Sequence, residues 1–390
     1  MALNSVKYLP NYGWKSVVIT AARSREFGQD NSVSMNMPAG VQVMRTTSWE
    51  NLISRMLNWL GVVPDAMFGW QPFALSTAKL CREPIAAIIS RSNPITSHLI
   101  ARQLKRYVGP HVPWIALFGD PWTQNPYITY RWPWMKPYRE WMERKIVQEA
   151  DAIIVTTQLT RQLFINQYGV SDKIYVLPNT YDPEEFRDLN GESASQSSDP
   201  RLTLTYAGNF YGLRSPEPLF QAQQLIKQTW PLAHQHLRVK FIGSMGEFSP
   251  LIYQYQIQDL VEMVGKLPRH QTLQELSRSH VLISVDAAQP VPSIFLPAKL
   301  ADYLAFKKPI LAITPPGETA DFIERTGAGL IASPGNPSGI AQSIKQFYQL
   351  FSQGKLIASV NPTALNQYSA IEYSRKLMAL LDQLVASKTS

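Results

Sequence analysis

Short apolar runs alternate with amphipathic segments along almost the whole chain of 390 residues. In the first half we expect strands at 16–20, 41–44, 85–89, 113–118, 152–156 and 173–177. Helical periodicity falls between them, at 47–60, 97–107, 134–149 and 159–168. Strands that alternate with helices pair in parallel, because each helix returns the chain to the same edge of the sheet. The pattern therefore predicts an α/β fold with a parallel sheet covered on both faces.

The same alternation restarts after a polar, serine-rich segment at 191–200, which is typical of a linker. We expect a first domain over 1–185, a linker over 186–200, a second domain over 201–368 and a last amphipathic helix within 369–390. Two doubly wound, Rossmann-like domains hold a ligand in a central cleft, at the carboxyl ends of their strands.

Positive charge and tryptophan are concentrated in the first half. Residues 1–180 hold 19 Lys and Arg against 11 Asp and Glu, whereas the rest of the chain holds 18 against 18. Nine of the ten tryptophans also precede residue 181. Basic residues mixed with Trp and Tyr suit an anionic membrane surface. Nucleic acid attracts the same charges, but the chain carries no helix-turn-helix, zinc-finger or RNP pattern, so we expect no nucleic-acid partner.

Composition also excludes several classes of protein. No uninterrupted apolar run reaches the ~18 residues that cross a bilayer. Residues 1–13 show no secretory signal. The single cysteine, Cys81, excludes an internal disulfide framework and a cysteine-based zinc site. These features predict a cytoplasmic protein, with peripheral contact at the inner membrane face as an extension of the charge argument.

The segment from Tyr206 to Pro218 is the most informative for chemistry. An expected strand ends at Gly208, a loop follows that contains Arg214, and Pro216 opens a helix. Unpaired N–H groups at a helix start and the guanidinium of Arg214 suit a diphosphate. An ordinary strand-to-helix loop with a surface arginine is the alternative.

Two further segments carry charged residues at expected strand or helix ends. Lys299 and Asp302 are three residues apart on a helix and share a face, either as ligands of phosphate and ribose or as a solvated ion pair. Asp120 follows the strand at 113–118, where a catalytic carboxylate is expected in this architecture, although Asp-Pro also begins turns.

An aromatic segment from Trp114 to Lys145 interleaves tryptophan and tyrosine with arginine and lysine. These aromatic residues either belong to a helical core or form a membrane-facing surface. The amphipathic segment at 47–60, with an expected capping box of Thr47 and Glu50, favours the surface.

These motifs, in this order, resemble a GT-B fold glycosyltransferase of glycosyltransferase family four over nearly the whole chain. Asp120-Pro-Trp122 resembles the "DPW" loop of a bacterial exopolysaccharide branch of that family. The other matching segments are 178–182 (PNTYD, for "PNG-x-D"), 208–218 (the donor phosphate loop), 265–268 (the "G-x-v-p" turn at the base) and 296–304 (the "P-x-K-x-x-E-Y-L" donor helix).

The resemblance implies roles for particular residues. It places the donor nucleotide-sugar on Gly208, Asn209, Arg214, Gly243, Lys266, Leu267, Pro297, Lys299 and Asp302. Asp120 is the candidate that activates or positions the acceptor hydroxyl. His98 and Trp122 are candidate acceptor contacts, and a plain helix-start histidine is the alternative for His98. The last helix is expected to pack back on the first domain.

Two departures from the family pattern bear on activity. The first acidic residue of its paired motif is Ile294 here, and only Asp302 remains. The chain also begins at what resembles the helix after the family's first strand and glycine-rich loop. We expect either that the start of the chain is misassigned or that the acceptor domain lacks both.

The resulting hypothesis is a retaining glycosyltransferase that moves a sugar from a nucleotide-diphosphate sugar, UDP- or GDP-linked, to a polysaccharide or lipid-linked glycan. No cofactor and no metal are expected, because no Asp-x-Asp occurs. The alternative is a non-catalytic GT-B relative that binds nucleotide or glycan as a regulatory or partner subunit.

Overall fold

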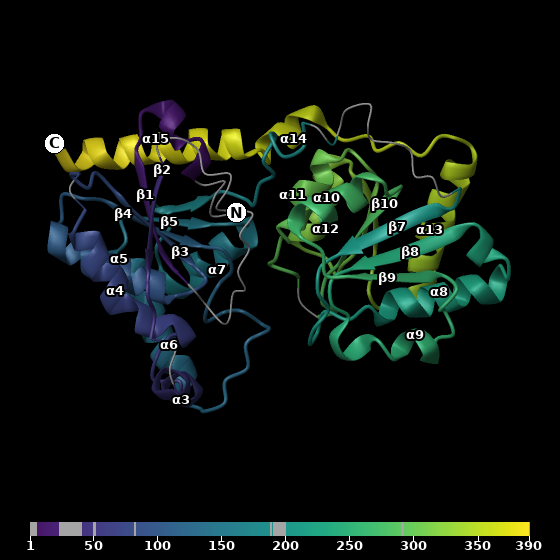
Figure 1. Cartoon of the computed structure of the whole chain (residues 1–390), viewed down its shortest axis with the longest axis horizontal. Helices are drawn as coiled ribbons and strands as arrows, with labels where there is room; N and C mark the ends of the chain where they lie inside the picture. Colours follow the sequence, from purple (N-terminus) through teal and green to yellow (C-terminus); the bar gives the residue numbers. More distant parts are fainter. Residues whose placement is uncertain are drawn as a thin grey trace. The chain divides into compact units, whose positions relative to one another are not determined.

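The computed structural model describes residues 6–22, 41–49, 52–81, 83–187, 189, 200–289 and 292–389. Two compact α/β units make up the chain (Figure 1). Unit 1 comprises residues 1–178 and 370–390, and unit 2 comprises residues 179–369. The division falls between Pro178 and Asn179, ahead of the expected linker; of that linker, residues 188 and 190–199 lie outside the described part.

Unit 1 is built on a parallel four-stranded sheet with the order β3-β4-β5-β6. Its two middle strands are wholly buried, as their apolar sequences require. A second parallel pair, β1-β2, forms a sheet of its own among the described residues. The strands are β1 (Ser16–Ala21), β2 (Val41–Thr46), β3 (Ile88–Ser92), β4 (Trp114–Phe118), β5 (Ala152–Val155) and β6 (Ile174–Val176).

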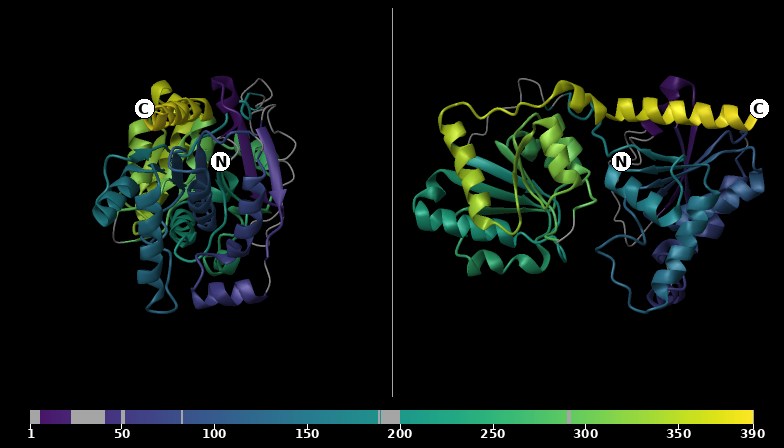
Figure 2. Two further views of the ribbon diagram at one scale, coloured as in Figure 1. Left: turned by 90° about the vertical axis from the view of Figure 1, so that its left-hand side faces the viewer. Right: turned by 180° about the vertical axis from the view of Figure 1, so that it is seen from behind.

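Helices surround these strands. Short 3-10 turns, η1 (Leu9–Tyr12) and η2 (Ala66–Trp70), accompany α3 (Leu52–Leu60), α4 (Gln71–Lys79), α5 (Thr96–Val108), α6 (Met135–Glu149) and α7 (Gln158–Tyr168). The last helix, α15 (Ala370–Thr389), belongs to unit 1 and runs along it as the yellow helix of Figures 1 and 2. Its Leu377 and Leu381 pack with Ile115 and Leu117 of β4, so the end of the chain completes the core of unit 1.

Unit 2 contains one six-stranded parallel sheet with the order β12-β11-β10-β7-β8-β9. The first strand of this unit, β7, lies next to the fourth, β10, and the strand order reverses there. Such a reversal is where doubly wound folds bind ligands. The strands are β7 (Leu202–Ala207), β8 (Leu237–Ile242), β9 (Val261–Gly265), β10 (Val281–Val285), β11 (Ile310–Ile313) and β12 (Gly329–Ala332).

Each face of this sheet has its own hydrophobic core. One core is formed with α8 (Glu217–Thr229), α9 (Leu251–Gln254) and α13 (Pro337–Ser352), and the other with α10 (Arg269–Ser277), α11 (Lys299–Ala305) and α12 (Glu318–Thr326). The remaining elements are η3 (Ala233–Gln235), η4 (Gly246–Phe248) and α14 (Pro362–Gln367). The α/β fold predicted from the alternating sequence is therefore confirmed.

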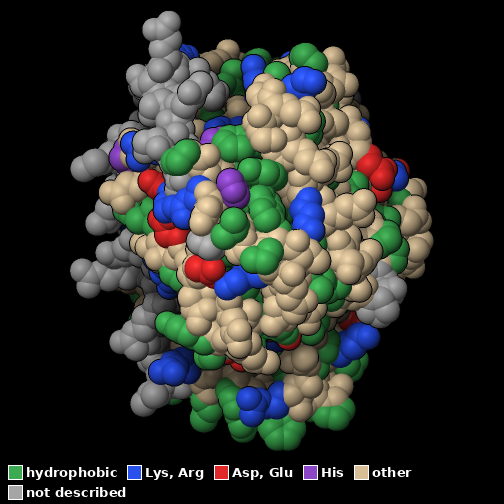
Figure 3. All heavy atoms as spheres, turned by 90° about the vertical axis from the view of Figure 1, so that its right-hand side faces the viewer, with side chains coloured by type: hydrophobic (Ala, Val, Ile, Leu, Met, Phe, Trp, Pro, Cys, Tyr) green, Lys and Arg blue, Asp and Glu red, His purple; other side chains and the backbone are tan. Residues whose placement is uncertain are grey.

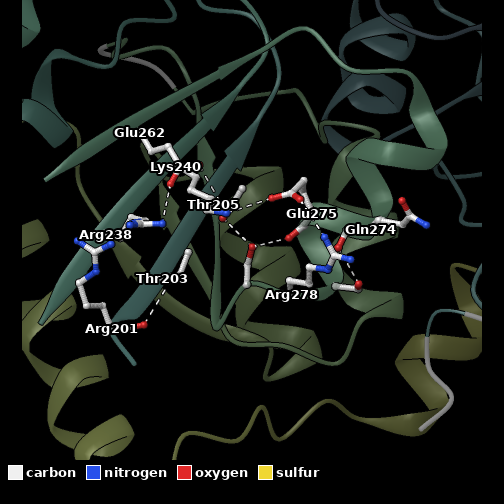
Figure 4. Close-up of polar contacts among 11 residues, drawn as sticks. Arg201, Thr203, Thr205, Arg238, Lys240, Glu262, Gln274, Glu275 and Arg278 are labelled. Atoms are coloured by element: carbon white, nitrogen blue, oxygen red, sulfur yellow. Dashed lines mark hydrogen bonds and ion pairs between the residues drawn. The ribbon is translucent and has the colours of Figure 1, made fainter. Parts of the chain in front are cut away.

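Away from the carboxyl edge, polar contacts link β8, β9 and α10 (Figure 4). Lys240 Nζ lies 3.1 Å from Glu275 and 3.7 Å from Glu262, and Ser279 Oγ donates to Thr205 Oγ1 at 2.6 Å. Figure 3 shows a face on which basic and acidic side chains both occur. Among the described helices, none combines the length and the apolar character that a membrane crossing requires.

Several element boundaries differ from the expectation. Strand β3 begins at Ile88, not at residue 85, because its pairing with β4 runs from Ile88–Trp114 to Ser92–Phe118. Among the described helices and strands, four were not expected from the sequence, namely α4, α14, β9 and β12. The described part of α3 begins at Leu52, residues 47–49 are not helical, and Glu50 of the expected capping box lies outside the described residues.

Truncation of Leu377 tests how α15 stabilises unit 1. Leu377 has no exposed surface, so Leu377→Ala is expected to cost about 2–5 kcal/mol through lost burial and the cavity left behind. Ile371 on the same helix is 46% exposed, and Ile371→Ala should change stability by less than about 0.5 kcal/mol. Urea unfolding followed by tryptophan fluorescence reports mainly unit 1, which holds nine of the ten tryptophans. Equal effects of the two substitutions would refute the packing role.

Candidate functional site: the carboxyl edges of the two sheets

The loops that follow β7 and β8 touch each other at two glycines. A β-carbon on Gly243 would lie 2.1 Å from the carbonyl oxygen of Gly208, closer than any side chain permits. Both glycines also have positive φ angles, 146° at Gly208 and 124° at Gly243. Asn209 Oδ1 accepts a hydrogen bond from the Ser244 amide at 2.9 Å, and Gly243 N–H donates to the Gly265 carbonyl at 2.7 Å. The loops after three adjacent strands are therefore joined into one backbone surface.

Arg214 stands at the end of the first of these loops. A tight turn brings Tyr211 and Arg214 opposite each other, and the guanidinium lies 5.4 Å from the centre of the Tyr211 ring. Three residues further on, α8 begins at Glu217, so Arg214 stands just before the amino end of a helix. Both features favour an anion at this position.

Lys299, the first residue of α11, points its ammonium group into the same region. Its Nζ lies 3.6 Å from the centre of the Tyr206 ring and is screened from solvent. Among the described residues no hydrogen-bond acceptor lies within reach of this atom. Burial lowers the pKa of Lys299 well below its usual value, and the nearby charge of Arg214 lowers it further, while Asp286 opposes the shift. Such an ammonium is poised to gain from an anionic ligand.

Asp302, on the same helix, is held by a different cation from the one that the sequence suggested. The guanidinium of Arg269 donates to both oxygens of Asp302 at 3.1 Å, and it also pairs with Glu185 at 2.6 Å. Burial raises the pKa of Asp302, although Arg269 opposes that shift. The expected alternative of a solvated Lys299–Asp302 ion pair is therefore replaced by an Arg269–Asp302 pair.

The remaining expected donor contacts border this region in unit 2. Lys266 is exposed and Leu267 is half-buried in the turn that follows Gly265 at the end of β9. Pro297 is half-buried and precedes α11, where its carbonyl accepts from the Leu300 amide at 3.0 Å.

In unit 1, Asp120 is exposed just beyond the carboxyl end of β4. Arg91, from the neighbouring strand β3, interacts with it electrostatically. Burial lowers the pKa of Arg91, and the charge of Asp120 opposes that shift. Asp120 therefore combines solvent access with a nearby cation.

A buried carboxylate fixes the loop that carries Asp120. Glu143 of α6 accepts hydrogen bonds from the backbone amides of Trp122 and Thr123, both at 3.2 Å. The hydroxyl groups of Thr123 and Tyr168 also donate to it. Burial raises the pKa of Glu143, and these four donors counteract the shift. The loop after β4 is thus attached to the core of unit 1.

The two expected acceptor contacts, Trp122 and His98, are both buried in unit 1. The Trp122 ring lies under the Arg139 guanidinium at 5.7 Å. His98 has no exposed surface, its Nδ1 lies 2.7 Å from Ser90 Oγ, and its ring packs 4.5 Å from Phe118. These side chains reach an acceptor only if the surrounding core opens.

Comparison with known proteins relates the first half of the chain to a family model and the whole chain to solved structures. The model of the family described as Glycosyltransferase Family 4 matches residues 1–185. The fold is similar to sucrose-phosphate synthase of Thermosynechococcus elongatus, with a TM-score of 0.68 at 14% identity, covering 98% of this chain and 92% of the other. Anabaena HepE with UDP and glucose has a TM-score of 0.66 at 13% identity over 98% of this chain and 94% of its own. The chain has the GT-B fold.

A third GT-B structure, the lipopolysaccharide outer core galactosyltransferase WaaB, has a TM-score of 0.58 at 12% identity over 96% of this chain and 99% of its own. A search of curated proteins finds no match to the sequence. The predicted resemblance to GT-B glycosyltransferases of family four is confirmed, over residues 1–185 by the family model and over nearly the whole chain by the fold. The "DPW" branch stays a prediction.

Sequence reasoning missed three charged residues of this GT-B chain. Asp286 follows β10 directly and Asp120 comes two residues after β4, so a similar strand-end signal was available for Asp286. Arg269 and Glu143 gave no such signal, because each lies on a helix and its partner is distant in sequence. Among the described residues, no group of three or more His, Cys, Asp or Glu could hold a metal ion.

The titration of His98 tests whether the core of unit 1 holds it neutral. Burial lowers the pKa of His98 to about 3, whereas an unfolded histidine titrates near 6.5. The unfolded chain therefore binds more protons between these values, and stability must fall as the pH drops below 6.5. The expected loss is about 1.4 kcal/mol per pH unit, and it should be absent in His98→Gln. Denaturant unfolding from pH 7 to 5, followed by tryptophan fluorescence, measures it.

The exposed His111 provides the matched control, because His111→Gln should retain the wild-type slope. A wild-type slope equal to that of His98→Gln would contradict a neutral, buried His98.

Proposed function

We propose that this protein transfers a sugar from a nucleotide diphosphate to a glycan hydroxyl, with the donor bound at the carboxyl edge of unit 2. The observation that carries the proposal is the buried Lys299 ammonium, which has no hydrogen-bond acceptor among the described residues and interacts electrostatically with Arg214. A buried ammonium that has no hydrogen-bond acceptor is costly unless an anionic ligand supplies one. A diphosphate supplies that anion.

These cations also suit the chemistry of the transfer. When the bond between the anomeric carbon and the phosphate oxygen breaks, negative charge grows on the leaving diphosphate. Arg214 and Lys299 stabilise that charge without reorganisation, because the protein already holds them in place. We therefore propose that no metal ion and no cofactor are needed.

The proposed donor contacts continue along the edge of the sheet. Asp302 accepts hydrogen bonds from the ribose diol, and the turn with Lys266 and Leu267 meets the base. Gly208, Asn209 and Gly243 supply the backbone surface under the phosphates, with Pro297 leading into the Lys299 helix. Among the structural relatives, HepE is bound to UDP-glucose, and the pneumococcal O-GlcNAc transferase GtfA is bound to UDP and GlcNAc. UDP is therefore the preferred proposal over GDP.

For the acceptor we propose that Asp120 orients or deprotonates the attacking hydroxyl. The new bond forms between that oxygen and the anomeric carbon as the diphosphate leaves, and the hydroxyl proton passes to Asp120 or to the leaving phosphate. Attack from the side that the diphosphate vacates gives retention of configuration. The exposure of Asp120 at a strand end supports this role. His98 and Trp122 contribute to the acceptor side only by shaping the core beneath the Asp120 loop.

We further propose that the acceptor is a polysaccharide or lipid-linked glycan, as in exopolysaccharide synthesis, reached at the cytoplasmic face of a membrane. Helix α3 supports this idea, because its apolar stripe faces solvent. Ile53, Met56 and Trp59 are 61%, 53% and 50% exposed, at positions three residues apart on one helical face. A water-soluble surface has little reason to expose such a stripe, and a lipid interface does.

Aromatic and basic residues near α3 strengthen the proposal. The Trp59 ring packs edge-on against Trp132 with centroids 5.8 Å apart, and Arg131 lies 5.2 Å from the Trp59 ring. On α6, Trp141 is 53% exposed and stacks with Tyr138. Amphipathic rings next to arginine suit the headgroup region of anionic lipids.

Binding of UDP is the first experiment on the donor site. Ligand at ~100 times its dissociation constant stabilises a protein by about 2.7 kcal/mol, so UDP should raise the melting temperature by several degrees. The rise should persist in EDTA and should be strongly reduced in Arg214→Ala and in Lys299→Met, because each removes a cation from the diphosphate. Differential scanning fluorimetry with UDP, GDP and ADP measures it.

Arg278→Ala is the matched control, since Arg278 is an exposed arginine of unit 2 that pairs with Glu275. It should keep the full UDP shift. No shift with any nucleotide would overturn the proposed donor site. A UDP shift without turnover on any glycan would favour the non-catalytic alternative, for which Ile294 at the usual acidic position is the supporting observation.

Membrane contact predicts salt-sensitive binding to vesicles. The protein should co-sediment with phosphatidylglycerol vesicles at low salt and less at high salt, because screening weakens the attraction of its basic residues. The double substitution Ile53→Ser and Trp59→Ser should reduce binding at least about tenfold through lost apolar burial. Leu232→Ser, at a 53% exposed leucine of unit 2, is the control and should bind as wild type. Absence of wild-type binding at low salt would end the membrane proposal.

A further inference from the structure

Asp286 is a buried carboxylate at the point where the strand order of unit 2 reverses. It follows β10 directly, next to β7, and is only 2% exposed. Three hydroxyl groups lie within hydrogen-bond distance of its Oδ2 atom: Ser293 at 3.1 Å, Thr314 at 3.3 Å and Thr319 at 3.0 Å. The two threonine hydroxyls also reach the backbone carbonyls of Pro315 and Phe295. The contacts with Asp286, all at one carboxylate oxygen, fix the orientation of its side chain.

The other oxygen, Oδ1, has no hydrogen-bond donor among the described residues. Buried polar atoms are nearly always satisfied, and an exception calls for a ligand, a water molecule or a catalytic role. The unsatisfied ammonium of Lys299 interacts electrostatically with Asp286, so two incomplete groups of opposite charge share this end of the sheet. A ligand here should present oxygen acceptors to Lys299 and a proton donor to Asp286.

The order of the strands indicates which part of a nucleotide-sugar would lie next to Lys299 and Asp286. The turn proposed for the base follows β9, the phosphate loop follows β7, and Asp286 follows β10 on the far side of that loop. Adjacent strands are ~4.8 Å apart, so β9 and β10 are separated by roughly 14 Å. In an extended nucleotide-sugar, the distance from the base to the sugar is similar to this separation of β9 and β10. Asp286 therefore lies at the sugar end.

We propose that Asp286 binds a hydroxyl group of the transferred sugar through its Oδ1 atom and thereby selects neutral sugars. This assignment rests on the proposed donor site. A phosphate is excluded as the partner of Oδ1, because both groups are anionic, whereas a sugar hydroxyl is a neutral donor. A sugar that carries its own carboxylate would place a second negative charge near Asp286, so hexuronic acids are rejected.

The proposed contact predicts different binding affinities for a nucleotide and for its sugar conjugate. A hydrogen bond to a buried charge contributes at least about tenfold to affinity, and a substrate that lacks the partner leaves the carboxylate oxygen unsatisfied. Asp286 should therefore add affinity for a UDP-sugar and add little for UDP itself.

Isothermal titration of the full chain with UDP, UDP-glucose, UDP-galactose and UDP-glucuronate tests the proposal. In the wild type, at least one neutral UDP-hexose should bind more tightly than UDP, and UDP-glucuronate about tenfold more weakly than that hexose. In Asp286→Asn, which keeps the shape of the side chain, affinity for the preferred UDP-hexose should fall about tenfold while affinity for UDP stays within about twofold.

Arg278→Ala is the matched control, because Arg278 is an exposed residue of unit 2 that pairs with Glu275 and does not contact Asp286. Both affinities should stay within about twofold, and the circular dichroism of both variants should match the wild type. Equal losses for UDP and UDP-hexose in Asp286→Asn, or no loss at all, would overturn the sugar contact while leaving the donor site intact. Absence of UDP binding to the wild type would overturn the donor site itself, and this assignment with it.

Discussion

The carbonyl oxygen of Gly208 occupies the space that a β-carbon on residue 243 would need, and the backbone surface at the carboxyl edge of unit 2 depends on that contact. Only glycine lets the loops after β7 and β8 approach so closely. Once they touch, the Asn209 side chain and the Gly243 and Gly265 backbone join three strand ends. Gly208 and Gly243 carry no side chains, so the proposed diphosphate can approach the backbone closely there.

Glu143 and Asp286 are both buried carboxylates, but their hydrogen-bond partners are distributed differently. Glu143 accepts hydrogen bonds from Trp122, Thr123 and Tyr168. These bonds hold the loop that carries Asp120. Asp286 is as buried as Glu143, but its donors all meet one oxygen. Burial alone therefore does not indicate function, and the distribution of partners over the two oxygens does.

Some of the candidate site was predictable from the sequence, because residues that follow parallel strands lie at a common edge of the sheet. The family resemblance placed Gly208, Arg214 and Lys299 at one donor site, and in the structure Lys299 of unit 2 interacts electrostatically with Arg214. The burial of His98 depends on Phe118 and on Ser90, neither of which its own segment reveals. Similarly, helical periodicity locates the apolar stripe of α3 but cannot say which side other elements cover. Whether a stripe is core or surface is decided by tertiary packing.

The pairing of Asp302 with Arg269 leaves room for the proposed contact between Asp302 and a ribose. Arg269 uses one N–H on each carboxylate oxygen, at 3.1 Å, and directs its remaining capacity to Glu185. Each oxygen of Asp302 keeps a second lone pair, so a diol can still donate to it. A carboxylate fixed by a planar guanidinium also loses little rotational freedom when the diol arrives, since its plane is already set. Asp302 is one methylene shorter than the glutamate of the motif that it resembles. The cation that stabilises it, Arg269, is the first residue of α10, the helix that follows the proposed base turn.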